Sequence, residues 1–165
     1  MLKLKVLEDQ DEQTFMSALE EWQQDDLSYY CTHWQPGMTF KDLVVALQDI
    51  RLGKNLPQDF VPATTFYAFD DSKIVGRLTL RHQLTEKLMK YGGHIGYGVN
   101  PSQRNKGYAS QMLKLALHEA AELGLEKVLL TCDHTNIGSI KVIEKNNGQL
   151  YETGKNRRSY WIITK

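Results

Sequence analysis

A stretch of glycine and basic residues in the middle of the chain has the pattern of a phosphate-binding turn. Residues 94–100 form an apolar, glycine-spaced run that stops at Pro101, and Arg104, Lys106 and Gly107 follow just before a long amphipathic segment. The N-terminus of a helix exposes unpaired N–H groups and a partial positive charge, which together favour phosphate. A glycine there lets the backbone approach the ligand closely. The sequence therefore predicts a cradle for a phosphate-bearing ligand between a strand and a helix.

Two other phosphate-binding motifs do not fit the chain. The Gly-Lys pairs at Gly53 and Gly154 lack the upstream glycine and the following Ser or Thr of a nucleotide P-loop. The glycines at 96 and 98 run into Pro101 and lack the third glycine of a dinucleotide-binding turn.

The hydrophobic pattern predicts strands and helices that position this turn. Period-two apolar runs predict strands, and apolar residues at every third or fourth position predict helices. Strands are expected over 2–7, 63–69, 73–82, 92–99, 127–131, 150–153 and 159–164, and helices over 11–24, 40–52, 106–123 and 136–148. Residues 25–38 and 54–62 are expected to be irregular, and 84–90 fit either a helical turn or an extended loop.

The order of these elements places the predicted ligand site. The strand–helix–strand unit over 92–131 should have two parallel strands joined by a right-handed crossover. Ligands of such units bind beyond the carboxyl ends of the strands. We therefore expect the site between residues 99–109 on one side and 131–136 on the other.

Composition narrows the function class. The 165 residues have a formal net charge of zero, so no overall field attracts nucleic acid or a membrane surface. Two cysteines give no disulfide framework, and no apolar run approaches the roughly 18 residues of a membrane-spanning helix. We expect one domain over residues 1–165, a cytoplasmic location, no metal, and a monomer or homodimer that binds neither nucleic acid nor membrane.

The charges are divided unevenly along the chain. Residues 1–60 contain eleven Asp or Glu against five Lys or Arg, whereas 61–165 contain nine against fifteen. One interpretation is a chance distribution of solvated charge. The other is an acidic face for a cationic substrate and a basic face for an anionic cofactor.

Residues 99–109, VNPSQRNKGYA, resemble the acetyl-CoA signature of the GNAT superfamily of N-acetyltransferases. The core of that signature, Q/R-x-x-G-x-G/A, is matched by Arg104, Gly107 and Ala109. Residues 136–139 and 145–148 resemble the second motif of the superfamily. The resemblance implies a mixed α/β fold whose central sheet has about seven strands, mostly antiparallel with one parallel splayed pair, flanked by about four helices.

The resemblance also implies a role for each matching position. Backbone amides of 104–109 would hold the pyrophosphate of coenzyme A, and the backbone of 97–99 would pair with the pantetheine arm. The Val99 N–H would polarise the thioester carbonyl, and Asn136 would bond the cofactor near the opposite strand. The expected cofactor-binding residues are Tyr97, Gly98, Val99, Arg104, Asn105, Lys106, Gly107, Tyr108, Ala109, Asn136 and Ser139.

The chain departs from the superfamily at Ile143, where a tyrosine often protonates the leaving thiolate. A thiol has a pKa of about 8.5, so thiolate can leave without a dedicated acid. The acid is therefore absent, is water, or is one of Tyr97, Cys132, His134 and Tyr151.

A base is needed on the amine side, because an alkylamine of pKa near 10 is neutral in about one molecule in a thousand at pH 7. His94 is the expected base, since it lies on the strand that leads to Val99 and titrates near neutrality. The alternative is a histidine that only packs or hydrogen-bonds at the start of the strand.

Three further patterns have alternative interpretations. Cys31 with His33 and Cys132 with His134 form two Cys-x-His pairs, but their spacing differs from common zinc modules. Cys132 with His134 also suggests a nucleophile. An aromatic group near Asp25 and Asp26 is either core packing or a site for a cationic amine; its members are Trp22, Tyr29, Tyr30, Trp34 and Phe40.

Three function classes follow from the sequence. The expected one is an N-acetyltransferase that moves the acetyl group of acetyl-CoA directly to a primary amine of a small molecule, an amino acid or a peptide. The alternatives are an acyl-CoA-binding module without turnover and a nucleic-acid-binding domain, and the latter lacks any helix-turn-helix or basic-aromatic signature.

Overall fold

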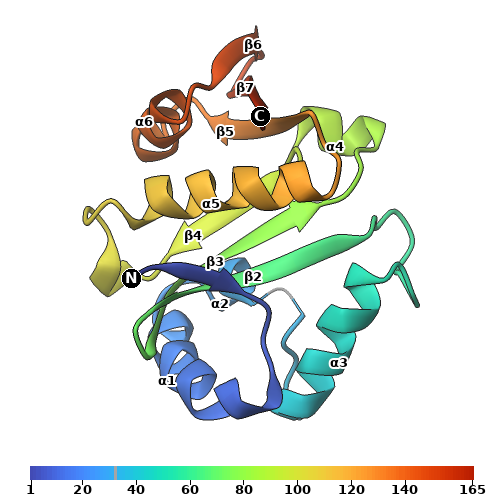
Figure 1. Ribbon diagram of the computed structural model, residues 1–165, viewed down its shortest axis with the longest axis vertical. Coiled ribbons are helices and arrows are strands. Elements are labelled where there is room, and N and C mark those ends of the chain that lie inside the picture. The colour runs from blue at the N-terminus through green and yellow to red at the C-terminus, as the bar shows by residue number, and fades with distance from the viewer. Residues whose placement is uncertain (32) are drawn as a thin grey trace.

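A four-stranded antiparallel sheet built on a central hairpin forms the middle layer of the computed structural model (Figure 1). The structure describes residues 1–31 and 33–165, and their side chains except those of Ser28 and Tyr29. Strands β2 (Ala63–Asp70) and β3 (Lys73–Arg81), close to the strands predicted over 63–69 and 73–82, form an antiparallel hairpin, and Asp71 takes the positive φ that its tight turn needs. Strands β1 (Lys3–Lys5) and β4 (Ile95–Val99) complete the sheet in the order β1-β2-β3-β4.

A second antiparallel sheet, in the order β5-β7-β6, lies toward the C-terminal end of the chain. Its strands are β5 (Lys127–Asp133), β6 (Gln149–Thr153) and β7 (Arg157–Ile163). The two sheets meet beside His94, whose backbone N–H donates to the Leu129 carbonyl at 2.7 Å.

Helices cover both faces of the first sheet (Figure 1). Helices α1 (Glu12–Gln23) and α3 (Phe40–Arg51) pack on one face, and α5 (Tyr108–Glu122) packs on the other. The remaining helices are α2 (Leu27–Tyr30), α4 (Glu86–Lys90) and α6 (Ile137–Lys145), with 3₁₀ turns at Asp9–Asp11 and Pro101–Gln103. In the described part of the chain, none of the helices is long and apolar enough to cross a bilayer.

Local sequence signals account for most of these boundaries. Helix α3, predicted over 40–52, begins at a capping box in which Thr39 and Asp42 bond each other's backbone N–H. Residues 84–90, expected as either a helical turn or an extended loop, contain α4, which Thr85 caps by accepting from the Leu88 N–H. The segment expected to be irregular at 25–38 contains the short helix α2.

The expected single sheet of about seven strands with a parallel pair is not confirmed. Strands β4 and β5 form no ladder, and their junction is made by the backbone and the ring of His94. Its Nδ1 accepts the Leu129 N–H at 2.9 Å. Gly93 packs so closely on the Leu129 carbonyl that a Cβ there would collide with it. The strands separate beyond this contact, and the sheet divides into two.

Candidate functional site

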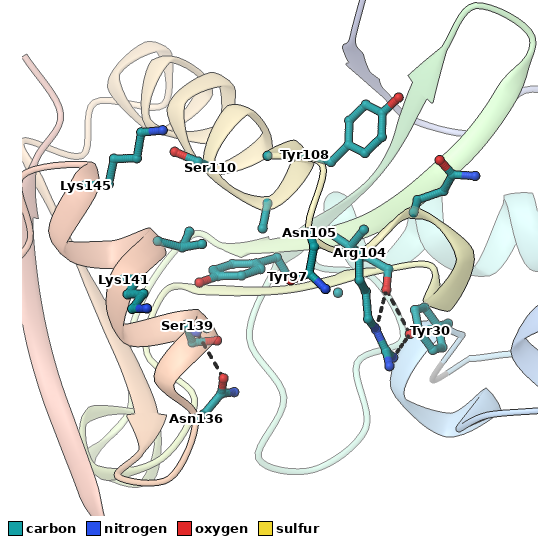
Figure 2. Close-up of a pocket in the computed structure, with 17 residues that line it drawn as sticks. Tyr30, Tyr97, Arg104, Asn105, Tyr108, Ser110, Asn136, Ser139, Lys141 and Lys145 are labelled. Atoms are coloured by element: carbon teal, nitrogen blue, oxygen red, sulfur yellow. Dashed lines mark hydrogen bonds between the residues drawn. The ribbon is translucent and has the colours of Figure 1, made fainter.

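A cavity of about 560 Å³ lies between β4, the start of α5 and α6 (Figure 2). Every expected cofactor-binding residue except Lys106 lines it. The Lys106 ammonium instead donates to Gln103 Oε1 at 3.0 Å. The structure therefore brings two sequence segments, 97–109 and 136–145, to one concave site. The lining residues are Tyr30, Tyr97, Gly98, Val99, Gln103, Arg104, Asn105, Gly107, Tyr108, Ala109, Ser110, Asn136, Gly138, Ser139, Lys141, Val142 and Lys145.

One wall of the cavity is the outer edge of β4. In an antiparallel ladder, alternate residues turn their N–H and C=O groups toward the partner strand. The Asn100 N–H donates to Val75 and the Arg81 N–H donates to the His94 carbonyl, so even-numbered residues of β4 face β3. The Val99 backbone consequently faces away from β3, on the side where the cavity lies. Its carbonyl accepts from the Tyr30 hydroxyl at 3.1 Å, so its N–H is the group directed at a ligand.

The end of the cavity is the N-terminus of α5. Asn105 and Gly107 both have positive φ, and this backbone conformation turns the chain into the helix. The first helical bond runs from the Gln111 N–H to the Gly107 carbonyl. The N–H groups of residues 108–110 precede that bond, no side chain caps them, and the first turn carries no acidic residue. These features favour an anion at this end of the cavity.

The Arg104 side chain is directed away from the helix N-terminus. Its guanidinium donates to Asp25 Oδ2 at 2.8 Å and to the Tyr30 hydroxyl at 2.9 Å, as Figure 2 shows in part. Its charge is therefore partly neutralised by Asp25. Arg104 positions the turn, and its side chain adds little positive charge for a phosphate.

Two lysines that sequence reasoning missed supply positive charge to the cavity. Lys141 and Lys145 lie one turn apart on α6 and line the side opposite β4. The two lysines are four residues apart within the helix predicted over 136–148, and this spacing places them on one face of the helix. That shared face is a sequence signal that could have identified them. The Asn136 Oδ1 accepts the Ser139 N–H at 3.0 Å, so this atom caps α6.

Tyr97 is the one of the four suggested acids that lines the cavity, where its ring extends from β4 toward α6 (Figure 2). Cys132 is buried in the core, and burial raises the pKa of its thiol. His134 bonds the Gly154 carbonyl through Nε2, and Tyr151 is exposed against Trp161. Ile143 belongs to the core, so its position supplies no hydroxyl to the cavity.

His94 lies outside the cavity that Val99 lines. It precedes Val99 by five residues, about 16 Å in an extended strand. Its side chain is 6 % exposed, and its Nδ1 is occupied by the Leu129 N–H. Burial, reinforced by the positive charge of Arg81, lowers the pKa of His94 to about 4. A base with that pKa is poorly matched to an amine, so the geometry favours the structural role of His94 over the catalytic one.

The lowered pKa of His94 predicts a loss of stability in acid. The folded protein keeps the ring neutral, whereas the unfolded chain protonates it below its usual pKa of about 6.5, so stability falls as pH drops from about 6.5 to 4. Between pH 7 and pH 5 the expected cost is about 2 kcal/mol. Urea denaturation at both pH values measures it.

The matched variant for this measurement is His94→Asn, whose Oδ1 can replace Nδ1 as acceptor for Leu129 without titrating. Burial also lowers the pKa of His33 and His82, so the difference between the two proteins isolates His94. We expect the variant to lose less stability between pH 7 and pH 5 and to retain its activity. Loss of activity with intact folding would restore His94 as the base.

In the part of the chain that is described, the aromatic group near Asp25 packs in the core, and Tyr30 also lines the cavity. Trp22, Tyr30 and Phe40 are buried with Phe15 beneath the first sheet. The Trp22 and Tyr30 rings stack with centroids 5.4 Å apart. Asp25 pairs with Arg104, so it offers no isolated negative charge to a cation. The Tyr29 side chain lies outside the described residues.

The two Cys-x-His pairs do not assemble a metal site among the described residues. Thr32, the middle residue of the first pair, lies outside them. Cys31 and Cys132 are both buried thiols.

Comparisons with known proteins identify the relatives of the chain. The model of the "Acetyltransferase (GNAT) family" matches residues 14–148. A Bacillus subtilis (strain 168) protein named as the uncharacterized N-acetyltransferase YnaD is 37% identical over 59 residues, which cover 33% of this chain and 35% of that protein. The match therefore spans about a third of the curated relative.

Solved structures show the same fold at low identity. An N-acetyltransferase from Staphylococcus aureus Mu50 aligns over 100% of this chain and 99% of its own, with a TM-score of 0.64 and 17% identity. A spermidine N-acetyltransferase from Vibrio cholerae, solved with CoA and spermine, aligns over 99% and 95%, with a TM-score of 0.62 and 17% identity.

Proposed function

The chain belongs to the acetyltransferase (GNAT) family, and we propose that it transfers an acetyl group from acetyl-CoA directly to a primary amine. One observation carries this proposal. The uncapped N-terminus of α5 and the outer edge of β4 line the same cavity of about 560 Å³. The first suits a pyrophosphate and the second suits the amide groups of a pantetheine arm. Lys141 and Lys145 add positive charge for an anionic cofactor.

The proposed reaction has one new bond and one broken bond. The amine nitrogen attacks the thioester carbonyl, the C–S bond breaks, and the thiolate takes up a proton. The Val99 N–H would donate to the carbonyl oxygen as negative charge develops there. Tyr97 carries one of the hydroxyls that line the cavity, and it would return a proton to sulfur. The residues that line the cavity include no His, Asp or Glu, so we propose that water removes the amine proton.

That absence of a lining base also favours the second candidate, an acyl-CoA-binding module without turnover. The two functions differ in whether an amine accelerates release of free thiol from acetyl-CoA. Deprotonating an alkylamine at pH 7 costs roughly 4 kcal/mol, so the rate of an enzyme without a base should rise with pH toward the amine pKa near 10.

A thiol-release assay with acetyl-CoA and a panel of amines tests the proposal. We expect amine-dependent release, with an acetylated amine recovered by mass spectrometry in the same amount as free CoA. Tyr97→Phe should lower kcat and leave CoA affinity unchanged. If acetyl-CoA raises the melting temperature but no amine accelerates thiol release, the protein is the binding module and the transferase proposal fails.

The family comparisons support an amine as the acceptor class. The Vibrio cholerae relative is named for spermidine, and its structure contains spermine. This likeness extends to the fold at 17% identity, so the charge and size of the acceptor must come from this chain's own residues.

A further inference from the structure

Two lysines of α6 line the cavity without a protein partner for their charge. Lys141 and Lys145 are exposed lining residues. In the described part of the chain, neither ammonium takes part in an ion pair, a side-chain hydrogen bond or a cation–π contact. An ammonium has three donors and no acceptor, so all the donors of both groups are available to a ligand.

The two charges lie on one face of the helix and repel each other. Residues four apart in a helix are neighbours, with about 5–6 Å between their Cβ atoms, and like charges at that spacing destabilise the helix. Glu144, the acidic residue of α6, accepts the Tyr160 hydroxyl at 3.3 Å and pairs with neither lysine. An anion that contacts both ammonium groups would remove the repulsion.

The helix that carries these lysines is joined to the start of α5. Asn146, at the end of α6, is buried, and its Nδ2 donates to Ser110 Oγ at 3.1 Å and to the Val142 carbonyl at 2.9 Å. Ser110 lies in the first turn of α5, whose uncapped N–H groups favour an anion. Figure 2 shows the Lys145 side chain extending toward Ser110. The lysines therefore lie beside the anion site of α5.

The lysines nevertheless form a second positive region of the cavity. The N–H groups belong to α5 at one end of the cavity, whereas the lysines belong to α6 on the side opposite β4. The remaining cation of the lining, Arg104, is paired with Asp25. A helix N-terminus is equivalent to roughly half a positive charge, so it suits one diphosphate better than a ligand with further negative charge.

Coenzyme A has negative charge in two places. A diphosphate joins its pantetheine arm to the ribose, and a separate phosphate monoester is attached at the 3′ oxygen of that ribose. A phosphate monoester carries about −1.5 to −2 charges at pH 7 and has three strong acceptor oxygens. Ammonium groups bind such a phosphate as point charges. The monoester is therefore the group of the cofactor that matches two neighbouring ammonium groups.

We propose that Lys141 and Lys145 bind the ribose 3′-phosphate of coenzyme A, so that the protein selects the complete coenzyme over its 3′-dephosphorylated form. The inference rests on the proposed function, since it places acetyl-CoA in this cavity. It gives the two positive regions separate tasks. The N-terminus of α5 takes the diphosphate, and the α6 lysines take the monoester.

Isothermal titration with CoA and with 3′-dephospho-CoA tests this proposal, because the two ligands differ in that phosphate alone. We expect the protein to bind CoA about tenfold more tightly than 3′-dephospho-CoA. The preference should shrink as salt rises from about 50 to 300 mM, because exposed charges are screened. In the thiol-release assay, acetyl-CoA and its 3′-dephospho form should differ in KM and share the same kcat.

Variants of the two lysines identify the groups responsible. Lys141→Met and Lys145→Met keep an aliphatic side chain without the charge, and the double variant should lose the preference for CoA while its affinity for 3′-dephospho-CoA stays within about twofold. Arginine at both positions should retain the preference. The matched control is Lys114→Met, an exposed lysine of α5 outside the cavity lining, which should change neither affinity. Melting temperatures without ligand show whether each variant folds.

The outcomes distinguish this inference from the proposed function, because the titration needs no turnover. Equal affinity of the unsubstituted protein for the two ligands overturns the 3′-phosphate site, and acetyl transfer then stands or falls by its own assay. An equal loss of affinity for both ligands in the folded double variant overturns it as well, because the lysines would then act on the diphosphate. If CoA does not bind at all, the proposed function itself fails and this inference fails with it.

Discussion

Replacing Gly107 with aspartate is expected to weaken CoA binding about 100-fold. The residue precedes α5 with φ +82°, and the uncapped N–H groups of that helix begin at the next residue. A carboxylate there would occupy the anion site and repel a pyrophosphate. At about 4 Å the repulsion between two charges is about 1–4 kcal/mol for effective dielectric constants between water and a protein surface. A hundredfold loss corresponds to about 3 kcal/mol within that range.

The matched control is Gly107→Asn, which has the same shape without the charge. Asn and Asp both tolerate the left-handed backbone conformation better than other side chains, so the two variants share any backbone strain. Isothermal titration with CoA gives both affinities, and the melting temperatures without CoA report the common cost to folding. Equal CoA affinity of the two variants would overturn the assignment of the helix N-terminus as the phosphate site.

Replacing Asn100 with alanine is expected to destabilise the fold by about 4 kcal/mol. The side chain is 2 % exposed and joins three elements at the end of β4. Its Oδ1 accepts the Trp22 indole N–H at 2.9 Å, and its Nδ2 donates to the Ile74 carbonyl at 2.9 Å. Alanine leaves both partners buried and unsatisfied, at about 1–3 kcal/mol each.

Urea denaturation at pH 7 measures this loss of stability, and a substitution at an exposed asparagine serves as the control. Asn156→Ala, in the turn between β6 and β7, should change the free energy of unfolding by less than about 0.5 kcal/mol. Asn100→Asp keeps an acceptor for Trp22 but sets an oxygen against the Ile74 carbonyl, so it should destabilise as well. If the free energy of unfolding of Asn100→Ala lies within about 1 kcal/mol of that of the unsubstituted protein, the buried hydrogen bonds do not stabilise the end of β4.

Sequence reasoning predicted the features that depend on neighbouring residues. The helix at 40–52 carries its own cap at Thr39, and the hairpin at 63–82 carries its own turn at Asp71. The uncapped helix start at the end of the cavity was predictable for the same reason, because strand, glycine and helix start follow one another within residues 95–109.

Features that depend on distant residues could not be predicted from the local sequence. Tyr30 reaches the Val99 carbonyl across 69 positions, and nothing around residue 30 indicates that contact. His94 has the residue type and strand position of a base, but the Leu129 N–H, 35 residues away, occupies its ring nitrogen.

The width of the cavity depends on the side chains of the core, because few hydrogen bonds join the two sheets. Beside His94 and Leu129 the sheets share few bonds, so the side chains packed beneath α5 set the angle between them. Ala116 and Ala120 lie on the buried face of this helix, where a larger side chain would act as a wedge. Substitutions of core residues that do not contact the ligand can therefore change how well the ligand fits the cavity.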